Sequence, residues 1–311
     1  MIRSLASVPA LPRGLSLGEA PATRRNWAYP SLAKTALSLR EKGDREPVGE
    51  GMANAGQVIP GPEPLERRKK ARQTSSAVPS EVRVGARVVP FNLGYALWAA
   101  TYDRQPNPLL ALEERVLQPR LPDLRRRTVL DVGCGTGRWL VRLLQRGARR
   151  GVGVDLSTEM LQYAASRGPQ SAWLARADAL ALPLRPKTMD LIICSFTLGH
   201  IENLSRLASE LARVARRRAD VYLSGLHPEA RARGWRCAFR HGGETIEIPE
   251  FNPPLEAVSG FFSAVGFKFV SLLEPHFGSE ERLIFVSAGK AEQFERATTV
   301  PAIFVCQFRR R

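Results

Sequence analysis

Short apolar runs alternate with amphipathic segments through the middle of the chain. The runs are rich in apolar and β-branched residues, which is typical of strands buried on both faces of a parallel sheet. They are Thr128–Val132, Gly151–Asp155, Ala172–Ala177, Met189–Phe196 and Asp220–Leu226. The segments between them place apolar residues on one side, which predicts helices. This alternation predicts an α/β fold with a doubly wound sheet.

The chain after the last of these runs predicts further elements. Gly242 and Gly243 separate two alternating segments, Trp235–Arg240 and Glu244–Ile248, and this pattern predicts a β-hairpin within an insertion. The alternative is a hairpin that extends the main sheet. Additional elements are predicted as helices over Pro108–Leu117, Glu202–Arg218 and Leu255–Val265, and strands over Phe267–Leu273 and Pro301–Phe308.

Two details of these helices are also predicted. Asn252 reads as the N-cap of the helix over Leu255–Val265. The helix over Glu202–Arg218 ends in cations that would complement its C-terminal partial negative charge. They are Arg213, Arg216, Arg217 and Arg218. We expect this basic face to be solvated rather than a nucleic-acid patch.

A glycine-rich segment follows the first strand and is the main candidate for ligand binding. From Asp131 to Gly137 it reads Asp-Val-Gly-Cys-Gly-Thr-Gly. A dinucleotide fingerprint would need its third glycine at Arg138 or at Leu140, and no Gly-Lys-Ser/Thr of a phosphate-binding loop is present. An acid at the end of the strand argues against a pyrophosphate there. The segment therefore indicates a ligand with positive charge.

This segment resembles the first motif of the class I S-adenosylmethionine-dependent methyltransferases. The resemblance covers about Tyr95 to Arg309 and is strongest between Thr128 and His200. It implies a Rossmann-like, seven-stranded sheet of order 3-2-1-4-5-7-6 and S-adenosylmethionine as cofactor. Asp131 would meet the ammonium group, Asp155 the ribose hydroxyls and Asp178 the adenine amino group. The expected cofactor contacts are Tyr102, Asp131, Gly133, Cys134, Gly135, Gly137, Asp155, Leu156, Met160, Asp178, Ala179 and Ser195.

The residues after the fourth strand bear on the acceptor. Methyltransferases that act on base nitrogens or protein amides carry Asn/Asp-Pro-Pro-Tyr/Phe there, whereas this chain has Ser-Phe-Thr-Leu-Gly-His ending at His200. The Leu-Gly-His-Ile sequence resembles the Leu-His-His-Val/Ile segment of quinone-ring and other small-molecule methyltransferases. It departs from that segment at Gly199. His200 is the candidate general base, and the alternative is a histidine that only packs beside the cofactor.

We expect methyl transfer to a small molecule, with O- or C-methylation favoured. The alternatives are an RNA methyltransferase and a non-catalytic S-adenosylmethionine-binding regulator. In the resembling family, an insertion after the fifth strand often covers the acceptor, and aromatic residues ahead of the first strand lie near it. The candidate acceptor contacts are Tyr95, Trp98, His227, Trp235, Arg236, Phe239 and Arg240. The alternative is that the aromatic residues only pack a helix against the sheet.

Composition adds few constraints. The 311 residues carry a net charge of +16, and the four cysteines are far apart with no Cys-x-x-Cys pair, so neither a metal site nor a disulfide framework is indicated. No apolar run approaches the roughly 18 residues of a membrane span. Residues 1–80 are a basic extension rich in Pro, Gly, Ala and Arg, which we expect to be disordered. We expect residues 81–311 to form the methyltransferase domain. The oligomeric state is left open.

The extension also bears on localisation. Its Arg- and Ser-rich, acid-poor beginning is compatible with an organelle transit peptide, but a cytoplasmic protein is the preferred interpretation. Met52 is a candidate start. The basic run from Arg67 to Arg72 is interpreted as a solvated linker, with contact to nucleic acid or acidic lipid as the alternative.

Overall fold

The computed structural model describes residues 85–104, 106–167 and 172–311. The predicted disordered extension, the transit-peptide alternative, Met52 and the basic run at 67–72 all lie outside the described residues.

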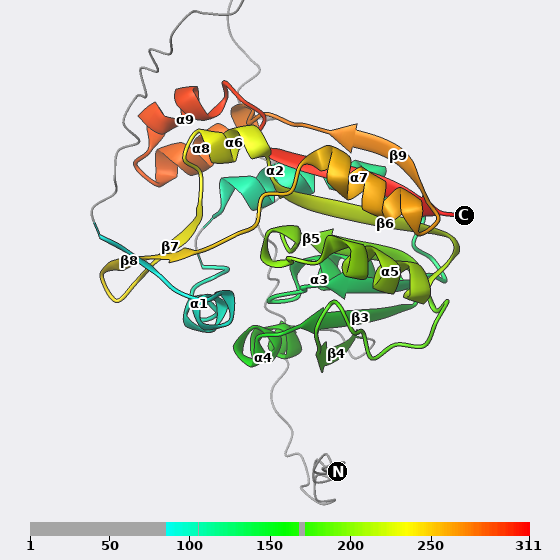
Figure 1. The fold of residues 1–311 in the computed structure, drawn as a ribbon. Coiled ribbons are helices and arrows are strands. Elements are labelled where there is room, and N and C mark those ends of the chain that lie inside the picture. Colours follow the sequence, from blue (N-terminus) through cyan, green and yellow to red (C-terminus); the bar gives the residue numbers. More distant parts are fainter. Residues whose placement is uncertain (1–84, 105, 168–171) are drawn as a thin grey trace, which may run out of the picture. The chain divides into compact units, whose positions relative to one another are not determined.

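The central feature is a sheet whose strands follow the order β4-β3-β2-β5-β6-β10-β9 (Figure 1). β4, β3, β2, β5 and β6 are parallel neighbours, and β10 runs antiparallel to both β6 and β9. The strands are β2 (Thr128–Val132), β3 (Arg150–Asp155), β4 (Ala172–Arg176), β5 (Met189–Ser195), β6 (Ala215–Leu226), β9 (Phe267–Leu273) and β10 (Ile303–Arg310). Numbered within this sheet, the order is 3-2-1-4-5-7-6, so the predicted topology is confirmed.

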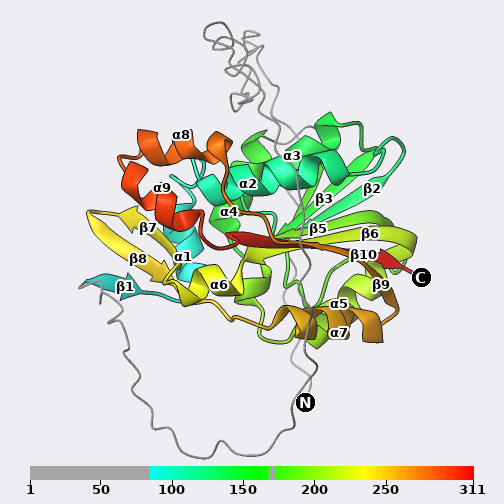
Figure 2. The same cartoon turned by 90° about the horizontal axis from the view of Figure 1, so that it is seen from above.

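Helices cover both faces of the sheet (Figure 2). On one face lie α2 (Pro108–Leu117) and α3 (Arg138–Gln145), and on the other α5 (Leu204–Val214) and α7 (Leu255–Ala264). α4 (Thr158–Arg167) follows β3. Trp139 and Leu143 of α3 are fully buried on the first face, as are Leu207 of α5 and Phe262 of α7 on the second. Each such side chain stabilises the fold by about 1.5–3 kcal/mol.

A smaller sheet stands apart from the central one (Figures 1 and 2). It consists of β1 (Ala86–Val88), parallel to β8 (Glu244–Ile248), which pairs antiparallel with β7 (Cys237–His241). The predicted hairpin is therefore confirmed, and it joins β1 rather than the seven-stranded sheet. Gly242 and Gly243 have φ of 57° and 86°, as a tight hairpin turn requires.

The helix α1 (Phe91–Trp98) packs against this small sheet. Its Trp98 ring stacks on Phe239 of the hairpin, with centroids 4.6 Å apart and planes 4° apart. Trp98 therefore packs α1 against the hairpin and not against the central sheet, and its predicted contact with the acceptor stays a prediction.

The predicted helix over Glu202–Arg218 is too long. α5 ends at Val214, and Arg216, Arg217 and Arg218 belong to β6, so they do not lie at the C-terminus of the helix. β5 and β6 are in register at Met189–Ala215 and again at Leu191–Asp220. The three arginines and the next residue form an irregular bulge opposite Asp190, which periodicity alone did not reveal.

Other differences concern the helix starts and the chain before β10. α7 has Pro254 as its N-cap with no side-chain cap, so the prediction that Asn252 caps it is wrong. Between β9 and β10 the chain forms α8 (Ser279–Ser287) and α9 (Ala291–Ala297), which were not predicted. Short helical turns also occur at η2 (Gln118–Arg120), η3 (Leu198–His200) and α6 (Pro228–Ala232).

Candidate cofactor and acceptor site

The topology gathers most of the predicted cofactor contacts at one edge of the sheet. The glycine loop follows β2, Asp155 and Leu156 end β3, Asp178 follows β4, and Ser195 ends β5. These strands are parallel neighbours, so their carboxyl ends lie together. A crevice at this edge, where the strand order reverses, is where ligands bind in open α/β sheets.

Asp155 connects the loop after β2 to the loop after β3. Its Oδ2 accepts a hydrogen bond from the Gly135 amide at 2.8 Å, and its Oδ1 accepts one from the Ser157 amide at 2.9 Å. Burial raises the pKa of this carboxyl, and the backbone donors oppose that shift. Leu156 beside it is 39% exposed, whereas Met160 is 1% exposed. Asp155 therefore ties the two loops together, Leu156 is exposed and Met160 is buried within the fold.

The glycines of the loop are required for two different reasons. Gly133 has φ of 66°, and a Cβ there would lie 2.2 Å from the Thr197 hydroxyl oxygen, which itself lies 3.1 Å from the Val132 carbonyl. Gly135 has φ of 52°, and no atom lies within 4 Å of the place where its Cβ would be. The first glycine therefore allows the loops after β2 and β5 to touch, and the second leaves open space for a ligand.

Two loop residues have buried side chains that make contacts within the protein. Asp131 is 1% exposed, and its Oδ2 accepts from the Leu140 amide at 3.0 Å in the first turn of α3. Burial raises the pKa of this carboxyl to about 7, although Arg138 acts in the opposite direction. The Cys134 side chain is buried against β3, where a Cβ on Gly153 would lie 2.9 Å from its Sγ. Asp131 therefore anchors α3, and Cys134 can offer a ligand only its backbone.

A buried polar network, which the sequence analysis missed, lies under this edge. Its centre is Glu113 of α2, whose side chain is fully buried. The Oε2 atom of Glu113 accepts from the Trp139 indole at 2.9 Å and from the Ser195 hydroxyl at 3.0 Å. Arg138 and Ser224 also bond to this carboxylate. Ser195, an expected cofactor contact, is thus engaged within the protein.

One nitrogen of this network has no partner. Arg138 Nη1 is buried and makes no hydrogen bond to any of the described residues. Burial alone would lower the pKa of Arg138, but the Glu113 carboxylate raises it overall, so the guanidinium stays charged. An unsatisfied buried donor costs about 1–3 kcal/mol, more when charged. The arrangement therefore fits a ligand that brings an acceptor such as a carboxylate.

The charge of Arg138 also affects the hydroxyl of Tyr102. Its ring meets that of Trp98 edge to face at 4.9 Å. Burial raises the pKa of its hydroxyl, and the charge of Arg138 partly offsets that shift. The predicted contact at Tyr102 is thus influenced by the charge of a cation that the prediction did not include.

His200 and Tyr95 are brought together. The Tyr95 hydroxyl lies 2.8 Å from His200 Nε2, and the two rings meet at 85° with centroids 5.2 Å apart. Burial, with the nearby Arg231 charge, lowers the pKa of His200 to about 4, and the Pro249 carbonyl opposes that shift. Burial also raises the pKa of Tyr95 well above its ordinary value. At neutral pH the imidazole is therefore uncharged, and its low pKa makes it a weak base.

Gly199 is explained by a buried ion pair. Arg231 Nη2 lies 2.7 Å from Glu250 Oε1, and the two side chains are only 10% and 8% exposed. A Cβ on Gly199 would lie 2.5 Å from that Glu250 oxygen and 3.1 Å from the Arg231 nitrogen. The ion pair therefore occupies the place where the resembling family carries its first histidine.

A pocket of about 430 Å³ adjoins this ion pair. Arg231, Arg236, Glu247, Glu250 and Asn252 supply its polar lining, with Pro228, Ala232, Ile248 and Pro249. The Arg236 guanidinium donates to the carbonyls of Arg231 and Trp235 at 2.8 and 2.7 Å. Of the acceptor contacts predicted in the insertion, Arg236 is the one that lines this pocket.

The other acceptor contacts predicted in the insertion do not line this pocket, and their side chains contact other parts of the protein. His227 caps α6 by accepting from the Glu229 amide at 3.1 Å, and its Nε2 lies 3.0 Å from Glu274. Trp235 stacks on Phe277 at 5.6 Å. Arg240 is exposed and donates to the Gly243 carbonyl at 2.9 Å in the hairpin turn. Their side chains therefore stabilise local structure.

Two observations apply only to the part of the chain that the structure describes. No group of three or more His, Cys, Asp or Glu side chains there could hold a metal ion, and the cysteines are free. None of the helices found in the described ranges has the length and apolar character needed to cross a membrane.

Comparison with known proteins identifies the domain. Residues 129–218 match the family model described as a methyltransferase domain. A biotin biosynthesis bifunctional protein BioHC of Cellvibrio japonicus is 33% identical over 130 residues, which are 42% of this chain and 26% of that protein. A demethylmenaquinone methyltransferase of Lactiplantibacillus plantarum is 33% identical over 93 residues, 28% of this chain and 39% of that protein. Relatives named for ribosomal protein L11 methylation and tRNA U34 carboxymethylation also match.

Solved structures agree at the level of the fold. An S-adenosylmethionine-dependent methyltransferase from Mesorhizobium loti superposes with a TM-score of 0.53 at 22% identity, over 66% of this chain and 100% of that one. The matched segment spans well under half of the first curated relatives, 26% and 39% of their lengths. Residues 129–218 therefore match a methyltransferase domain, and the sheet order and glycine loop resemble those of the class I S-adenosylmethionine-dependent methyltransferases, whose cofactor is S-adenosylmethionine.

Proposed function

We propose that this protein transfers the methyl group of S-adenosylmethionine to a polar small molecule, at oxygen or carbon. The observation that carries the proposal is the pocket of about 430 Å³ beside the turn that holds His200. This volume falls within the range of small-molecule sites, about 300–1,000 Å³.

Residues at the carboxyl edge of the sheet fit the cofactor. Arg138 Nη1, which lacks a partner among the described residues, would take the carboxylate of the amino-acid part. The open space over Gly135 would admit the part of the ligand that contacts the backbone of the glycine loop. Asp155 would accept the ribose hydroxyls, and exposed Leu156 would pack against the adenine. Asp178 and Ala179 after β4 complete the proposed adenine end.

The chain's own contribution to the reaction is to orient the reactants and exclude water. When bound, the cofactor supplies a methyl group that is already activated on sulfonium, so alignment and exclusion of water can provide much of the rate. His200 is neutral at neutral pH because burial lowers its pKa to about 4. Because a pKa of about 4 makes His200 a weak base, we propose that its Nε2 and the Tyr95 hydroxyl, 2.8 Å apart, orient the acceptor by hydrogen bonding rather than take its proton.

Two features favour a small acceptor over RNA at this site. Tyr95, Trp98 and Phe239 form a packed cover from α1 and the hairpin. The Arg231 cation at the pocket is already paired with Glu250, with both side chains nearly buried, so it is not available as a surface contact for a phosphate backbone.

Labelling distinguishes the candidate functions. The purified protein would be incubated with extract of the source cells and methyl-labelled S-adenosylmethionine, and the products separated by mass. We expect label in a compound of low molecular mass, and none with the Asp155→Ala variant. Label that nuclease releases, or label in protein, would contradict the small-molecule acceptor. Cofactor binding without any labelled product would favour a regulator.

A further inference from the structure

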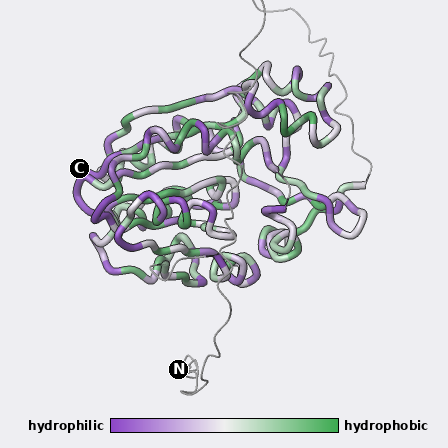
Figure 3. Tube along the Cα trace, turned by 180° about the vertical axis from the view of Figure 1, so that it is seen from behind, coloured by the Kyte–Doolittle hydropathy of each residue, from purple (hydrophilic) through white to green (hydrophobic). Residues whose placement is uncertain are grey.

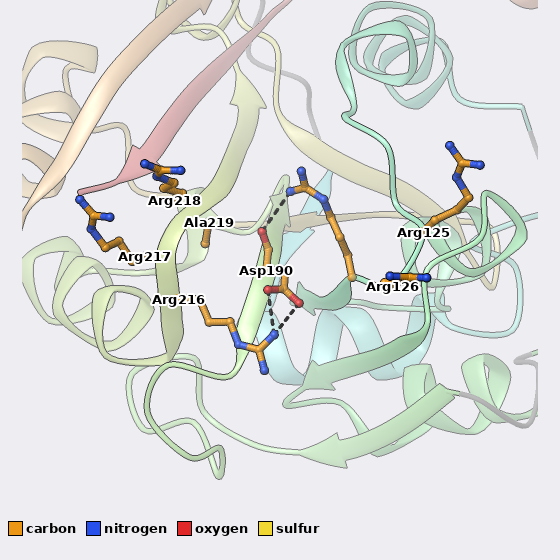
Figure 4. Close-up of a pocket in the computed structure, with 8 residues that line it drawn as sticks. Arg125, Arg126, Asp190, Arg216, Arg217, Arg218 and Ala219 are labelled. Atoms are coloured by element: carbon orange, nitrogen blue, oxygen red, sulfur yellow. Dashed lines mark hydrogen bonds and ion pairs between the residues drawn. The ribbon is translucent and has the colours of Figure 1, made fainter.

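A second candidate binding site lies at the opposite edge of the central sheet. Two arginine runs, Arg125–Arg127 and Arg216–Arg218, line a pocket of about 310 Å³ together with Asp190 and Ala219 (Figure 4). We call this the arginine pocket. The first run directly precedes β2 and the second lies near the start of β6. Because these strands are parallel, the arginine pocket lies at their amino ends, away from the cofactor loops.

The backbone around the arginine pocket is unusual in both runs. Arg126 and Arg218 each have φ of 65°, a left-handed conformation that is uncommon for residues other than glycine. Residues 216–219 also form the irregular segment of β6 opposite Asp190. Figure 4 shows Arg217 and Arg218 on one side of Asp190 and Arg125 and Arg126 on the other. Irregular backbone on both sides thus presents arginines around one hollow.

Three of the six arginines have acidic partners. Arg125 pairs with Asp123 at 2.9 Å, Arg216 with Asp190 at 2.8 Å, and Arg127 with Asp220 at 3.3 Å.

The other three, Arg126, Arg217 and Arg218, are exposed and have no acidic partner among the described residues. The arginine pocket therefore keeps a positive charge that its own acids do not neutralise.

The basic surface continues along the same edge. Arg149 and Arg150 are exposed at the start of β3, and the Arg149 amide donates to the Arg127 carbonyl at 2.9 Å. On the next strand, β4, Trp173 is 67% exposed and pairs in register with Val152. β4 lies two strands from β2, roughly 10 Å, and four strands from β6, roughly 20 Å, so Trp173 lies along the same edge but outside the arginine pocket. In Figure 3 the turns near the C-terminus, at this edge, are hydrophilic.

Although the sequence alone favours a solvated face at Arg216–Arg218, we propose that this edge binds the sugar–phosphate backbone of a single-stranded nucleic acid. Unpaired guanidinium groups match phosphate oxygens in charge and geometry, and an exposed aromatic ring beside a basic groove provides a stacking surface for a base. A strong membrane-binding surface adds an apolar face to its positive charge, whereas the arginine pocket has only Ala219 as an apolar lining residue. The site is independent of the acceptor that is methylated.

The test uses the full chain and a fluorescein-labelled 20-nucleotide poly(U) RNA. Anisotropy titrations between about 50 and 200 mM salt would compare the wild type with the triple variant Arg126→Gln, Arg217→Gln, Arg218→Gln. The matched control is Arg240→Gln, Lys290→Gln, Arg296→Gln, which removes equal charge from other exposed positions. The slope of log affinity against log salt is negative, and each phosphate contact contributes about 0.7 to its magnitude. We expect this magnitude to fall by about 2 in the first triple variant, which loses three contacts, and to change little in the control.

Equal slope changes in both triples, or none in either, would overturn the proposal. Tighter binding to phosphatidylserine vesicles than to RNA, lost in the first triple, would overturn the assignment to nucleic acid. If the triple variant does not fold, Arg217→Gln alone should lower the slope by about 0.7. Trp173→Ala should weaken RNA binding about 5- to 100-fold without changing the slope. Affinity for S-adenosylmethionine should be unchanged in these variants, which separates this site from the proposed function.

Discussion

At the scale of single residues, burial sets the chemistry of the proposed site. Asp131 and His200 are shifted in opposite directions, to pKa values of about 7 and about 4, because burial disfavours the charged form of each. Asp131 therefore contributes stability that is present at low pH and lost as pH rises toward 7. His200 contributes stability that is present above its ordinary pKa near 6.5 and lost as pH falls toward 4.

The effect of His200 can be isolated by substitution. Between pH 7.5 and pH 5 the wild type should lose more stability than His200→Gln, by about 1–2 kcal/mol, because the unfolded histidine binds a proton that the folded one excludes. Urea unfolding at both pH values measures this difference. The control variant is His276→Gln. His276 is exposed, so this variant should lose as much stability between the two pH values as the wild type. An equal loss in His200→Gln and wild type would contradict the assignment of a depressed pKa.

At the scale of elements, the turn after β5 and the insertion after β6 fit together through Gly199. The Arg231–Glu250 ion pair fills the space beside this glycine. Gly199 does not have a left-handed φ, so alanine there would meet no backbone strain. The packing of the insertion against the cofactor edge therefore depends on a missing side chain.

Alanine at this position tests the fit. Gly199→Ala should lower the free energy of unfolding by about 1–3 kcal/mol, because its Cβ would overlap the Glu250 carboxylate and disturb a nearly buried ion pair. Chemical denaturation measures the change. Gly260→Ala is the matched control, since no atom lies within 4 Å of its Cβ position, and the same change within a helix should raise stability by up to about 1 kcal/mol. Wild-type stability in Gly199→Ala would show that the contact is unimportant.

The elements also show how much of the fold and of the candidate site could be predicted from the sequence. The apolar runs predicted every strand of the central sheet: β2, β3, β5 and β6 have the pattern of strands buried on both faces, and the edge strands β4 and β9 still carry enough apolar residues although they are only partly buried. The β6 bulge was read as helix, since arginines in an irregular strand and on a helix surface have the same polarity. Glu113 was missed although it lies four residues from both Leu109 and Leu117 on the apolar face of α2. A charge in such a stripe signals a buried partner, here Arg138.

At the scale of the whole molecule, the described domain presents different chemistry at the two edges of one sheet. The carboxyl edge combines Asp155, the glycine loop and an unsatisfied arginine nitrogen, and the small sheet lies near it. The amino edge carries the arginine pocket. Parallel strands impose this separation, because all their carboxyl ends lie on one side. Cofactor binding and nucleic-acid binding are therefore predicted to be separable by mutation.

The most direct test of the proposed cofactor site is calorimetry with S-adenosylmethionine. The wild type should bind one equivalent, and Asp155→Ala should weaken affinity by about 1.5–3 kcal/mol, as expected when ribose hydroxyls lose a charged acceptor. Glu292→Ala, which changes an exposed acid on α9, should leave the affinity unchanged. No binding by the folded wild type, or wild-type affinity in a folded Asp155→Ala variant, would contradict the proposed site.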